Sequence, residues 1–307
     1  MMTRTSVLLL GFVFSGLSIR AQDHPAPDLL SAIDSQSAPP TSYASATFKT
    51  TRLINGHTVE GLGKGVLDFK ISHRFGKLNG GGYQLWGLDN ATMRMGFDYG
   101  ITDRILIGIG RSTFEKTFDL FFKVKLLRQS EGDINMPFTV SYIPTMAWTT
   151  LKFDKSRKNL SSSRYSYTHQ LLIARKFSAN TSLQLMPTFV HQNLVPLATD
   201  HNNMFAIGVG GRQKITRRTS FNAEYYYQLP STQLSGSTNS LSMGFDIETG
   251  GHVFQLHVTN SQGMTEKQFI SNTDGKWGKG DIFFGFNISR VFNVGKQRRK
   301  QVTPSGT

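Results

Sequence analysis

The chain has 307 residues, no Cys, and 34 Lys and Arg against 20 Asp and Glu, for a formal net charge of +14. The lack of Cys excludes a disulfide framework, a thiolate metal site and a Cys nucleophile. The basic excess collects at segment ends, as at Arg217 and Arg218, and in the tail from Lys296 to Lys300. Such ends suit anionic lipid headgroups, whereas nucleic-acid binding needs a basic face interleaved with aromatics in one module. We therefore expect no nucleic-acid partner.

Residues 1–21 have the features of a secretory signal peptide. Arg4 provides a basic start, an apolar run extends from Val7 to Val13, and small and polar residues lead to Ala21. A membrane anchor is the alternative, but the apolar run is far shorter than the roughly twenty residues that span a bilayer. We expect cleavage after Ala21, an exported protein, and a flexible lead-in within residues 22–60.

Across residues 65–292, apolar and polar side chains alternate in segments of about ten residues. Alternation at period two places one set of side chains on each face of a β-strand. In the first segment, Leu67 and Phe69 share one face and Asp68 and Lys70 share the other. The apolar face is rich in aromatics and nearly free of charge, which is typical of strands that face lipid. The predicted strands are residues 65–76, 91–101, 104–114, 117–128, 137–149, 164–177, 180–192, 203–215, 218–229, 239–249, 252–261 and 281–292.

The connections between these strands alternate in length. Long loops at one end and short turns at the other are typical of outer-membrane barrels, with the short turns periplasmic. We therefore predict an all-β fold, an antiparallel transmembrane β-barrel of about 12 strands at residues 61–293, followed by a basic tail at 294–307. A soluble β-sandwich is the alternative, but it would need a second layer over the aromatic face, and the sequence offers no helices for one.

Residues 43–60 form an extended, polar segment that contains an Asn55-Gly56 turn. A wall strand at 43–54 would be a thirteenth strand and would break the even number of such barrels. We therefore expect residues 43–60 to be a lumen plug or a periplasmic segment, with a wall strand as the alternative. The candidate plug residues are Phe48, Arg52, His57 and Glu60, and we expect His57 and Glu60 to cap the turn or to pair with Arg52.

The polar face of the predicted strands would line the lumen, and it carries both signs of charge in balance. A selective pore would show a ring of one sign, whereas a balanced set can pair across strands, so a narrow, charge-paired lumen is favoured. Inward glycines such as Gly96, Gly208 and Gly210 indicate either close approach by residues 43–60 or curvature of the barrel. The candidate lumen-lining residues are Asp68, Lys70, Arg74, Arg94, Asp98, Asp119, Lys123, Lys125, Glu224, Asp246 and Glu248, with Lys176 as a further basic member.

The residues that could carry chemistry are few. His257 and Ser261 lie close together, but their order and spacing do not match the Ser/His/Asn arrangement of outer-membrane phospholipases. His191 and His201, with Asp200, could be metal ligands on a long loop, although loop histidines are more often solvated. We expect no catalytic residues, no metal and no cofactor.

Several stretches in the first half of the chain are similar to a family of exported Bacteroidota β-barrel proteins known as a domain of unknown function. These stretches are Ala46–Glu60, Gly65–Gly76, Gly87–Asp89, Tyr99–Asp103 and Gly108–Arg111. The resemblance implies an exported barrel and brings no particular activity with it.

Together these features predict an outer-membrane β-barrel of a Gram-negative bacterium that binds or passes small polar solutes. Its expected partner is outer-membrane lipid. One alternative is a structural barrel that docks another envelope protein and transports nothing, and a second is a membrane-embedded hydrolase. The sequence does not identify a solute or an oligomeric state.

Overall fold

The structure is a computed structural model that describes residues 40–152 and 160–295. The predicted signal peptide, the lead-in as far as residue 39 and the tail from residue 296 lie outside these residues. The basic loop residues Lys155, Arg157 and Lys158 also lie outside them.

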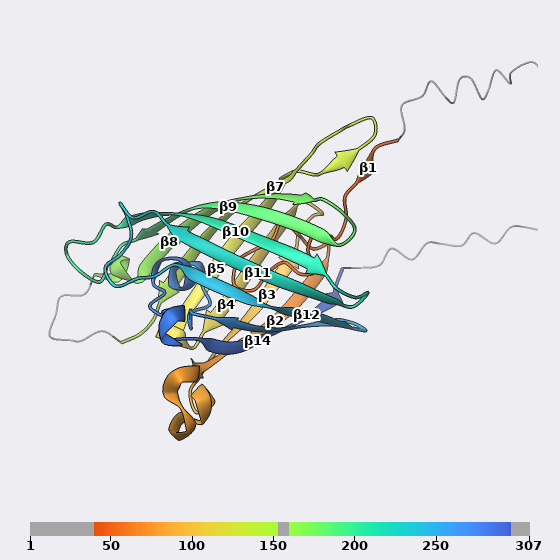
Figure 1. Cartoon of the computed structure of the whole chain (residues 1–307). Helices are drawn as coiled ribbons and strands as arrows, with labels where there is room; N and C mark the ends of the chain where they lie inside the picture. Colours follow the sequence, from red (N-terminus) through yellow and green to blue (C-terminus); the bar gives the residue numbers. More distant parts are fainter. Residues whose placement is uncertain (1–39, 153–159, 296–307) are drawn as a thin grey trace, which may run out of the picture. The chain divides into compact units, whose positions relative to one another are not determined.

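Twelve strands of the described residues form one closed antiparallel barrel (Figure 1). Each strand pairs with its neighbour along the chain, and β14 pairs with β2, where Asn293 opposes Val66, to close the sheet. Closure leaves the wall without an unpaired edge, which is the condition for a sheet to cross a bilayer. The wall strands are β2 (Val66–Lys77), β3 (Ala91–Gly100), β4 (Ile105–Ser112), β5 (Thr117–Leu127), β7 (Thr139–Thr149), β8 (Tyr165–Lys176), β9 (Thr181–Gln192), β10 (Asn203–Lys214), β11 (Thr219–Gln228), β12 (Ser240–Thr249), β13 (His252–Thr259) and β14 (Phe283–Asn293).

The predicted strands agree with these bounds to within two residues at every end. The prediction of an antiparallel barrel of about 12 strands is therefore confirmed. Period-two alternation was a sufficient guide because each strand separates an apolar environment from a polar one along its whole length.

The two ends of the barrel differ. At the turn end, tight turns join strands such as β8 and β9, and the chain enters β2 and leaves β14 there. Two short strands, β1 (Ser42–Tyr43) and β6 (Ser130–Glu131), pair in a small separate sheet at this end (Figure 1). The opposite end, the loop end, carries the long connections. Its short helices are η1 (Leu78–Gly80), η2 (Gly82–Gly87), η3 (Phe114–Lys116), η4 (Ser161–Arg164), the π-helix η5 (Lys267–Ser271) and η6 (Trp277–Lys279).

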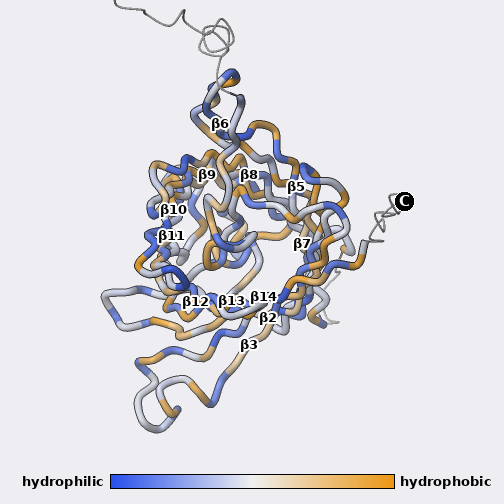
Figure 2. Tube along the Cα trace, turned by 90° about the vertical axis from the view of Figure 1, so that its right-hand side faces the viewer, coloured by the Kyte–Doolittle hydropathy of each residue, from blue (hydrophilic) through white to orange (hydrophobic). Residues whose placement is uncertain are grey.

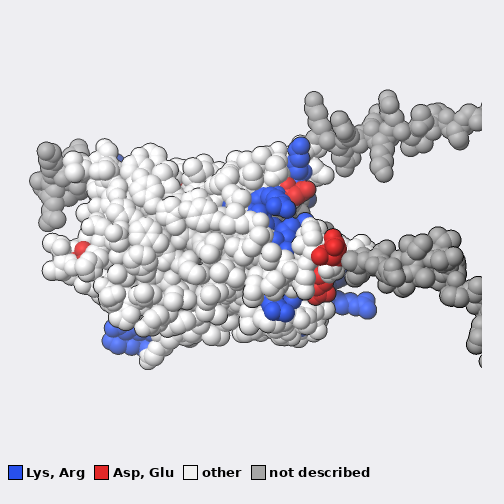
Figure 3. Space-filling view, turned by 90° about the horizontal axis from the view of Figure 1, so that it is seen from above, with Lys and Arg blue, Asp and Glu red and all other residues white. Residues whose placement is uncertain are grey.

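The outer surface of the wall is apolar. Phe97, Ile109 and Leu120 lie side by side on β3, β4 and β5 and are 47%, 53% and 48% exposed. Figure 3 shows that most of the Lys, Arg, Asp and Glu in view lie at the turn end and a few at the loop end, while the lateral wall between the ends carries almost none. An exposed apolar band of this kind is the surface that a transmembrane barrel presents to lipid. No helix among the described residues is long and apolar enough to cross a bilayer.

One half of the interior holds a buried apolar cluster and is here called the apolar half. Its side chains include Phe121, Leu172, Met186 and Tyr226, and inward hydroxyls and amides lie among them on β7–β9. On β2, β3 and β12–β14 the inward positions are mainly hydroxyls, amides, charges and glycines. The sequence pattern predicted the charged half but not the apolar cluster.

Placing a charge on the outer face tests whether it meets lipid. Ile109→Arg should lower the free energy of unfolding by about 2–4 kcal/mol, because a guanidinium near the middle of the bilayer loses its hydration. The measurement is urea unfolding in lipid vesicles followed by Trp fluorescence, with Ile109→Leu as the matched control. A change within about 0.5 kcal/mol, as on a water-exposed surface, would contradict lipid contact at this position.

Candidate functional site

Residues 47–60, here called the plug, form a hairpin inside the barrel. Figure 2, which faces the turn end, shows a chain segment within the ring of strands. Arg52 and His57 form an antiparallel bridge, and the Leu53 N–H donates to the Gly56 carbonyl at 2.8 Å, so residues 53–56 are the tip. Except for Lys49 and Glu60, all residues of the plug are buried. Residues 47–60 therefore do not form a wall strand.

The tip is held by a carboxylate of the wall. Glu224 on β11 accepts main-chain hydrogen bonds from Ile54 at 3.3 Å, Asn55 at 2.8 Å and Gly56 at 3.0 Å. Successive N–H groups that converge in this way form a nest for an anion. Gly is needed at position 56, because a Cβ on this residue would overlap the Tyr226 hydroxyl oxygen.

The carbonyls of the tip are held by amides. Gln255 donates to the Leu53 carbonyl at 2.8 Å, and Asn287 donates to the Ile54 carbonyl at 3.0 Å. Arg74 donates to the side-chain oxygens of both Asn55, at 2.7 Å, and Asn287, at 3.0 Å. The tip is therefore fixed through main-chain donors and acceptors together.

The other side of the plug is held by an ammonium group. Lys123 on β5 donates to the carbonyls of Thr58 and Glu60, each at 2.8 Å, and approaches that of Thr51 at 3.4 Å. Gln184 on β9 accepts from the Val59 N–H at 2.9 Å and donates to the His57 carbonyl at 2.7 Å. Within residues 40–152 and 160–295, Lys123 has no carboxylate partner within 4.0 Å, so plug carbonyls take that place.

A second insert enters from the loop end. The β13–β14 connection, residues 260–282, here called the outer loop, buries Phe269 and Ile270 completely. Phe269 packs edge-on against Tyr226 with ring centroids 5.3 Å apart. Gln228 donates to the Ile270 carbonyl and Gln192 to the Ser271 hydroxyl, both at 2.8 Å.

The two inserts meet inside the barrel. Arg52 of the plug donates to Glu266 of the outer loop at 2.6 Å, and both side chains are buried. The His57 ring lies 3.3 Å from the same carboxylate and packs on Phe121 at 4.4 Å between centroids. The expectation that Glu60 pairs with Arg52 is wrong, because Glu60 accepts from the Phe48 N–H and Arg52 reaches the outer loop instead.

Most candidate lumen charges face inward, and several pair within the wall. Lys70 pairs with Asp98 and, at 3.0 Å, with Asp68, while Arg94 pairs with Asp119. Lys125 and Glu248 are half-buried near the turn end, where Glu248 pairs with Lys49 of the plug at 2.5 Å. Of the candidate lumen charges, those that are nine-tenths or more buried are Asp68, Lys70, Arg74, Arg94, Asp98, Asp119, Lys123, Glu224 and Asp246.

The inward glycines make room for large side chains. A Cβ at Gly96 or Gly110 would collide with Arg94, and one at Gly208 would collide with Tyr226. At Gly210 the nearest atom belongs to the plug, and it is in the Leu53 side chain. Close approach by residues 43–60 therefore explains Gly210 but is the wrong explanation for the inward glycines whose nearest atoms belong to the wall, namely Gly96, Gly108, Gly110, Gly208 and Gly244.

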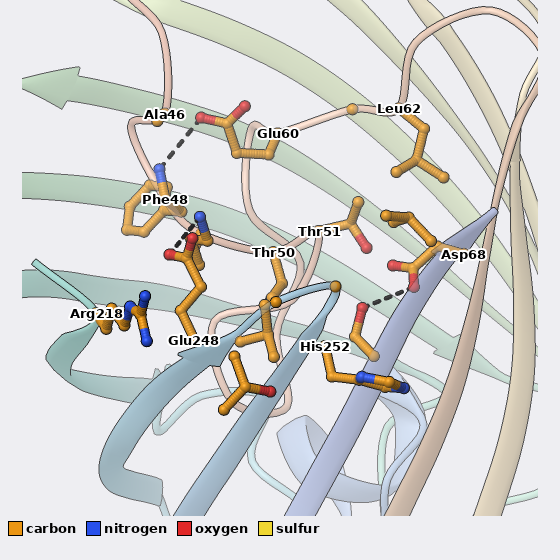
Figure 4. Close-up of a pocket in the computed structure, with 18 residues that line it drawn as sticks. Ala46, Phe48, Thr50, Thr51, Glu60, Leu62, Asp68, Arg218, Glu248 and His252 are labelled. Carbon is orange, nitrogen blue, oxygen red and sulfur yellow. Dashed lines mark hydrogen bonds and ion pairs between the residues drawn. The ribbon is translucent and has the colours of Figure 1, made fainter. Parts of the chain in front are cut away.

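Each end of the barrel keeps an open pocket beside an insert. The turn-end pocket, of about 550 Å³, lies between the plug and β12–β14, and its lining includes Phe48, Glu60, Arg218 and His252 (Figure 4). The loop-end pocket, of about 750 Å³, is lined by the outer loop together with residues of β2, β3 and their connection. The two pockets share no lining residue, and neither is lined by Arg52 or Glu266.

The long connections are tied to one another. The Ser235 hydroxyl and N–H donate to Asp200 at 2.7 and 3.0 Å, and these hydrogen bonds hold the pKa of Asp200 below its usual range. The Asn79 amide donates to Asp281 at 2.9 Å and, with Lys77, lowers the pKa of Asp281. Both carboxylates therefore stay ionised at neutral pH, and Asp281 holds Asn79, which lines the loop-end pocket.

The residues considered for chemistry are not arranged as a site. The Ser261 hydroxyl donates to the Gly263 carbonyl at 3.3 Å, and neither nitrogen of His257 has a hydrogen-bond partner. His191 bonds Asn203 and Asn193, while Asp200 bonds the β11–β12 loop. Among residues 40–152 and 160–295, no cluster of His, Asp and Glu could hold a metal ion.

Sequence reasoning missed two groups of site residues. The apolar half of the lumen could have been found, because inward positions such as Ile143 and Leu172 interrupt an otherwise polar register without charge. Glu266 and Gln268 gave no signal, because they stand in a long polar connection that resembles a solvated loop.

Glu224→Gln should loosen the plug. The substitution keeps the shape but turns one acceptor oxygen into a donor that faces the tip N–H groups, at a cost of about 1–3 kcal/mol. Trypsin should then cleave after Arg52 roughly tenfold faster, because the plug leaves the lumen more often. Asp119→Asn is the matched control, since Asp119 is similarly buried and pairs with Arg94 of the wall rather than with the plug. Equal cleavage of the two variants by mass spectrometry would contradict the role of Glu224.

Gly56→Ala should also expel the tip, by a clash with the Tyr226 hydroxyl at a cost of about 1–3 kcal/mol. Adding Tyr226→Phe removes the clashing oxygen and should restore part of the resistance to trypsin. Failure of the double variant to recover, with Tyr226→Phe alone behaving as the unaltered protein, would show that another constraint acts at Gly56.

Comparison with known proteins places the barrel in a family. Curated protein sequences gave no match to the chain. Among solved structures it is similar to the NanC porin (TM-score 0.46, 9% identity, 73% of this chain and 98% of that one). It is also similar to the KdgM porin (0.45, 6%, 74% and 99%) and to an outer-membrane channel from Pseudomonas putida F1 (0.45, 12%, 76% and 98%). The family model "Membrane bound beta barrel domain (DUF5777)" matches residues 48–292, which include most of the plug and the whole barrel except Asn293. The chain belongs to this family of membrane-bound β-barrel domains.

Proposed function

We propose that this protein is a channel for small polar solutes that the plug and the outer loop hold closed. The observation that carries the proposal is the meeting of the two inserts at Arg52 and Glu266, with a pocket open to solvent at each end. A barrel with a purely structural role needs packing inside it, but does not need an open pocket of several hundred Å³ at each end.

The wall favours polar solutes of either charge. Lys70, Arg94 and their carboxylate partners balance one another, so the open lumen would present no ring of one sign. The lining of the loop-end pocket includes amides such as Gln84, Asn90 and Gln262. It also includes Lys77, Glu115 and Asp274, so it carries charges of both signs and would not select solutes of one charge.

The barrel lies in the outer membrane, where even-numbered antiparallel barrels with an apolar exterior are found. In the orientation proposed here the turn end is periplasmic, so the plug would withdraw toward the periplasm. The division into a signal peptide at 1–21, a lead-in with plug at 22–60, a barrel at 61–293 and a tail at 294–307 belongs to the same proposal, as do the absence of enzymatic activity and the bacterial phylum that the sequence resembles.

Conductance in planar bilayers tests the proposal. Deletion of residues 47–60 should raise the single-channel conductance several-fold above that of the unaltered protein, because it removes the group that fills the turn-end half of the lumen. Because a deletion can impair folding, a second variant tests the plug in place. Asn55→Cys with Ser242→Cys, whose native side chains hydrogen bond at 2.9 Å, can be joined by a short bis-thiosulfonate reagent.

The joined double-Cys protein should show no openings, and reductant should restore those of the unaltered protein. The chain has no Cys of its own, so the single variants serve as clean controls. A deletion variant that folds but does not conduct would overturn the channel proposal. It would favour the docking alternative, for which the small β1–β6 sheet at the turn end is the candidate surface.

A further inference from the structure

The wall binds the plug mainly through its main chain. Five wall side chains donate to, or accept from, main-chain atoms of residues 51–60, namely Lys123, Gln184, Glu224, Gln255 and Asn287. These bonds do not depend on which side chains the bound segment carries. The same arrangement of donors and acceptors would fit the backbone of another peptide.

Withdrawal of the plug would leave charged wall groups without partners. Among the described residues, Glu224 bonds only to the tip N–H groups, and Lys123 only to plug carbonyls. Lys70 and Arg94, in contrast, keep their carboxylates. An open lumen would therefore expose the Glu224 carboxylate, which suits amide donors, and the Lys123 ammonium group, which suits carbonyls, and Arg74 would lose its bond to Asn55.

The apolar half of the lumen adds a preference for side chains. Leu53 of the plug packs beside Gly210 and Met186, and Phe48 and Val59 join the same buried cluster. A ligand that alternates peptide groups with aliphatic side chains would meet both halves of the lumen at once. A sugar would satisfy the polar groups but would leave the apolar wall uncovered.

We infer that the lumen is a binding site for short peptides with aliphatic side chains, and that the plug is a tethered occupant of that site. The inference rests on the proposed function, since it names the class of solute that the open channel would take. Free peptide would compete with the plug for Glu224 and Lys123, so peptide binding and plug withdrawal would be coupled.

The test uses the full chain with Gly56→Ala, in which the tip no longer fits while the wall groups are unchanged. The probe is a fluorescent peptide with the sequence of residues 47–60, and its binding is measured by anisotropy in detergent. The matched control is the same peptide N-methylated at the positions of Asn55 and Gly56, which keeps every side chain but lacks two donors to Glu224. The unmodified peptide should bind at least about tenfold more tightly.

Three further arms complete the design. A peptide that keeps only the side chains of positions 48, 53 and 59, with Gly at position 56 and Ser elsewhere, should still bind, whereas maltotriose should not compete. The variant lacking residues 47–60 repeats the measurement if Gly56→Ala does not fold. Equal binding of the N-methylated peptide, or no binding by either peptide, would overturn the inference.

The outcome for the channel is read separately. Conductance through the Gly56→Ala barrel without block by the peptide would leave the proposed channel intact and remove its peptide specificity. Specific peptide binding by a barrel that never conducts would support the peptide site and overturn the channel, and would identify a binding protein.

Discussion

The structure depends on one constraint: charged side chains buried inside a closed barrel need hydrogen-bond or ion-pair partners. Inside this barrel Glu224 and Lys123 have none on the wall, and the plug supplies them with main-chain N–H and carbonyl groups. A buried charge without a partner costs several kcal/mol. The plug therefore stabilises the barrel by bonding these charges, and the same bonds hold the plug in the lumen. This mutual requirement accounts for the deep burial of a polar hairpin that belongs to no strand of the wall.

The same constraint explains how two unrelated segments share one lumen. Arg52 is buried with the plug and Glu266 with the outer loop, and each neutralises the other where they meet. Either insert alone would bury an unpaired charge, so closure of the lumen is favoured when both inserts are in place. Withdrawal of the plug becomes easier if water or a ligand replaces both sets of contacts.

The sequence was sufficient for the wall because strand alternation is local. The alternation of Leu67, Phe69 and Ile71 with polar residues predicts which face of the strand is apolar without information from any distant residue. The predicted ends of each strand agree with the structure to within two residues. The inward charges followed from the same register. The even strand number and the Asn55-Gly56 turn narrowed the expected place of the plug to the lumen or the periplasm. They did not decide between these two places.

Partner choice in the lumen could not be predicted. Arg52 and Glu266 are 214 residues apart, and nothing near Glu266 distinguishes it from a solvated loop residue.

Amide exchange of the unaltered protein in lipid bilayers tests most directly the claim that the plug occupies the lumen. Burial of the tip predicts that the N–H groups of Ile54, Asn55 and Gly56 exchange at least about a thousandfold more slowly than in the free peptide. Exchange at the free-peptide rate would show that the plug does not occupy the lumen.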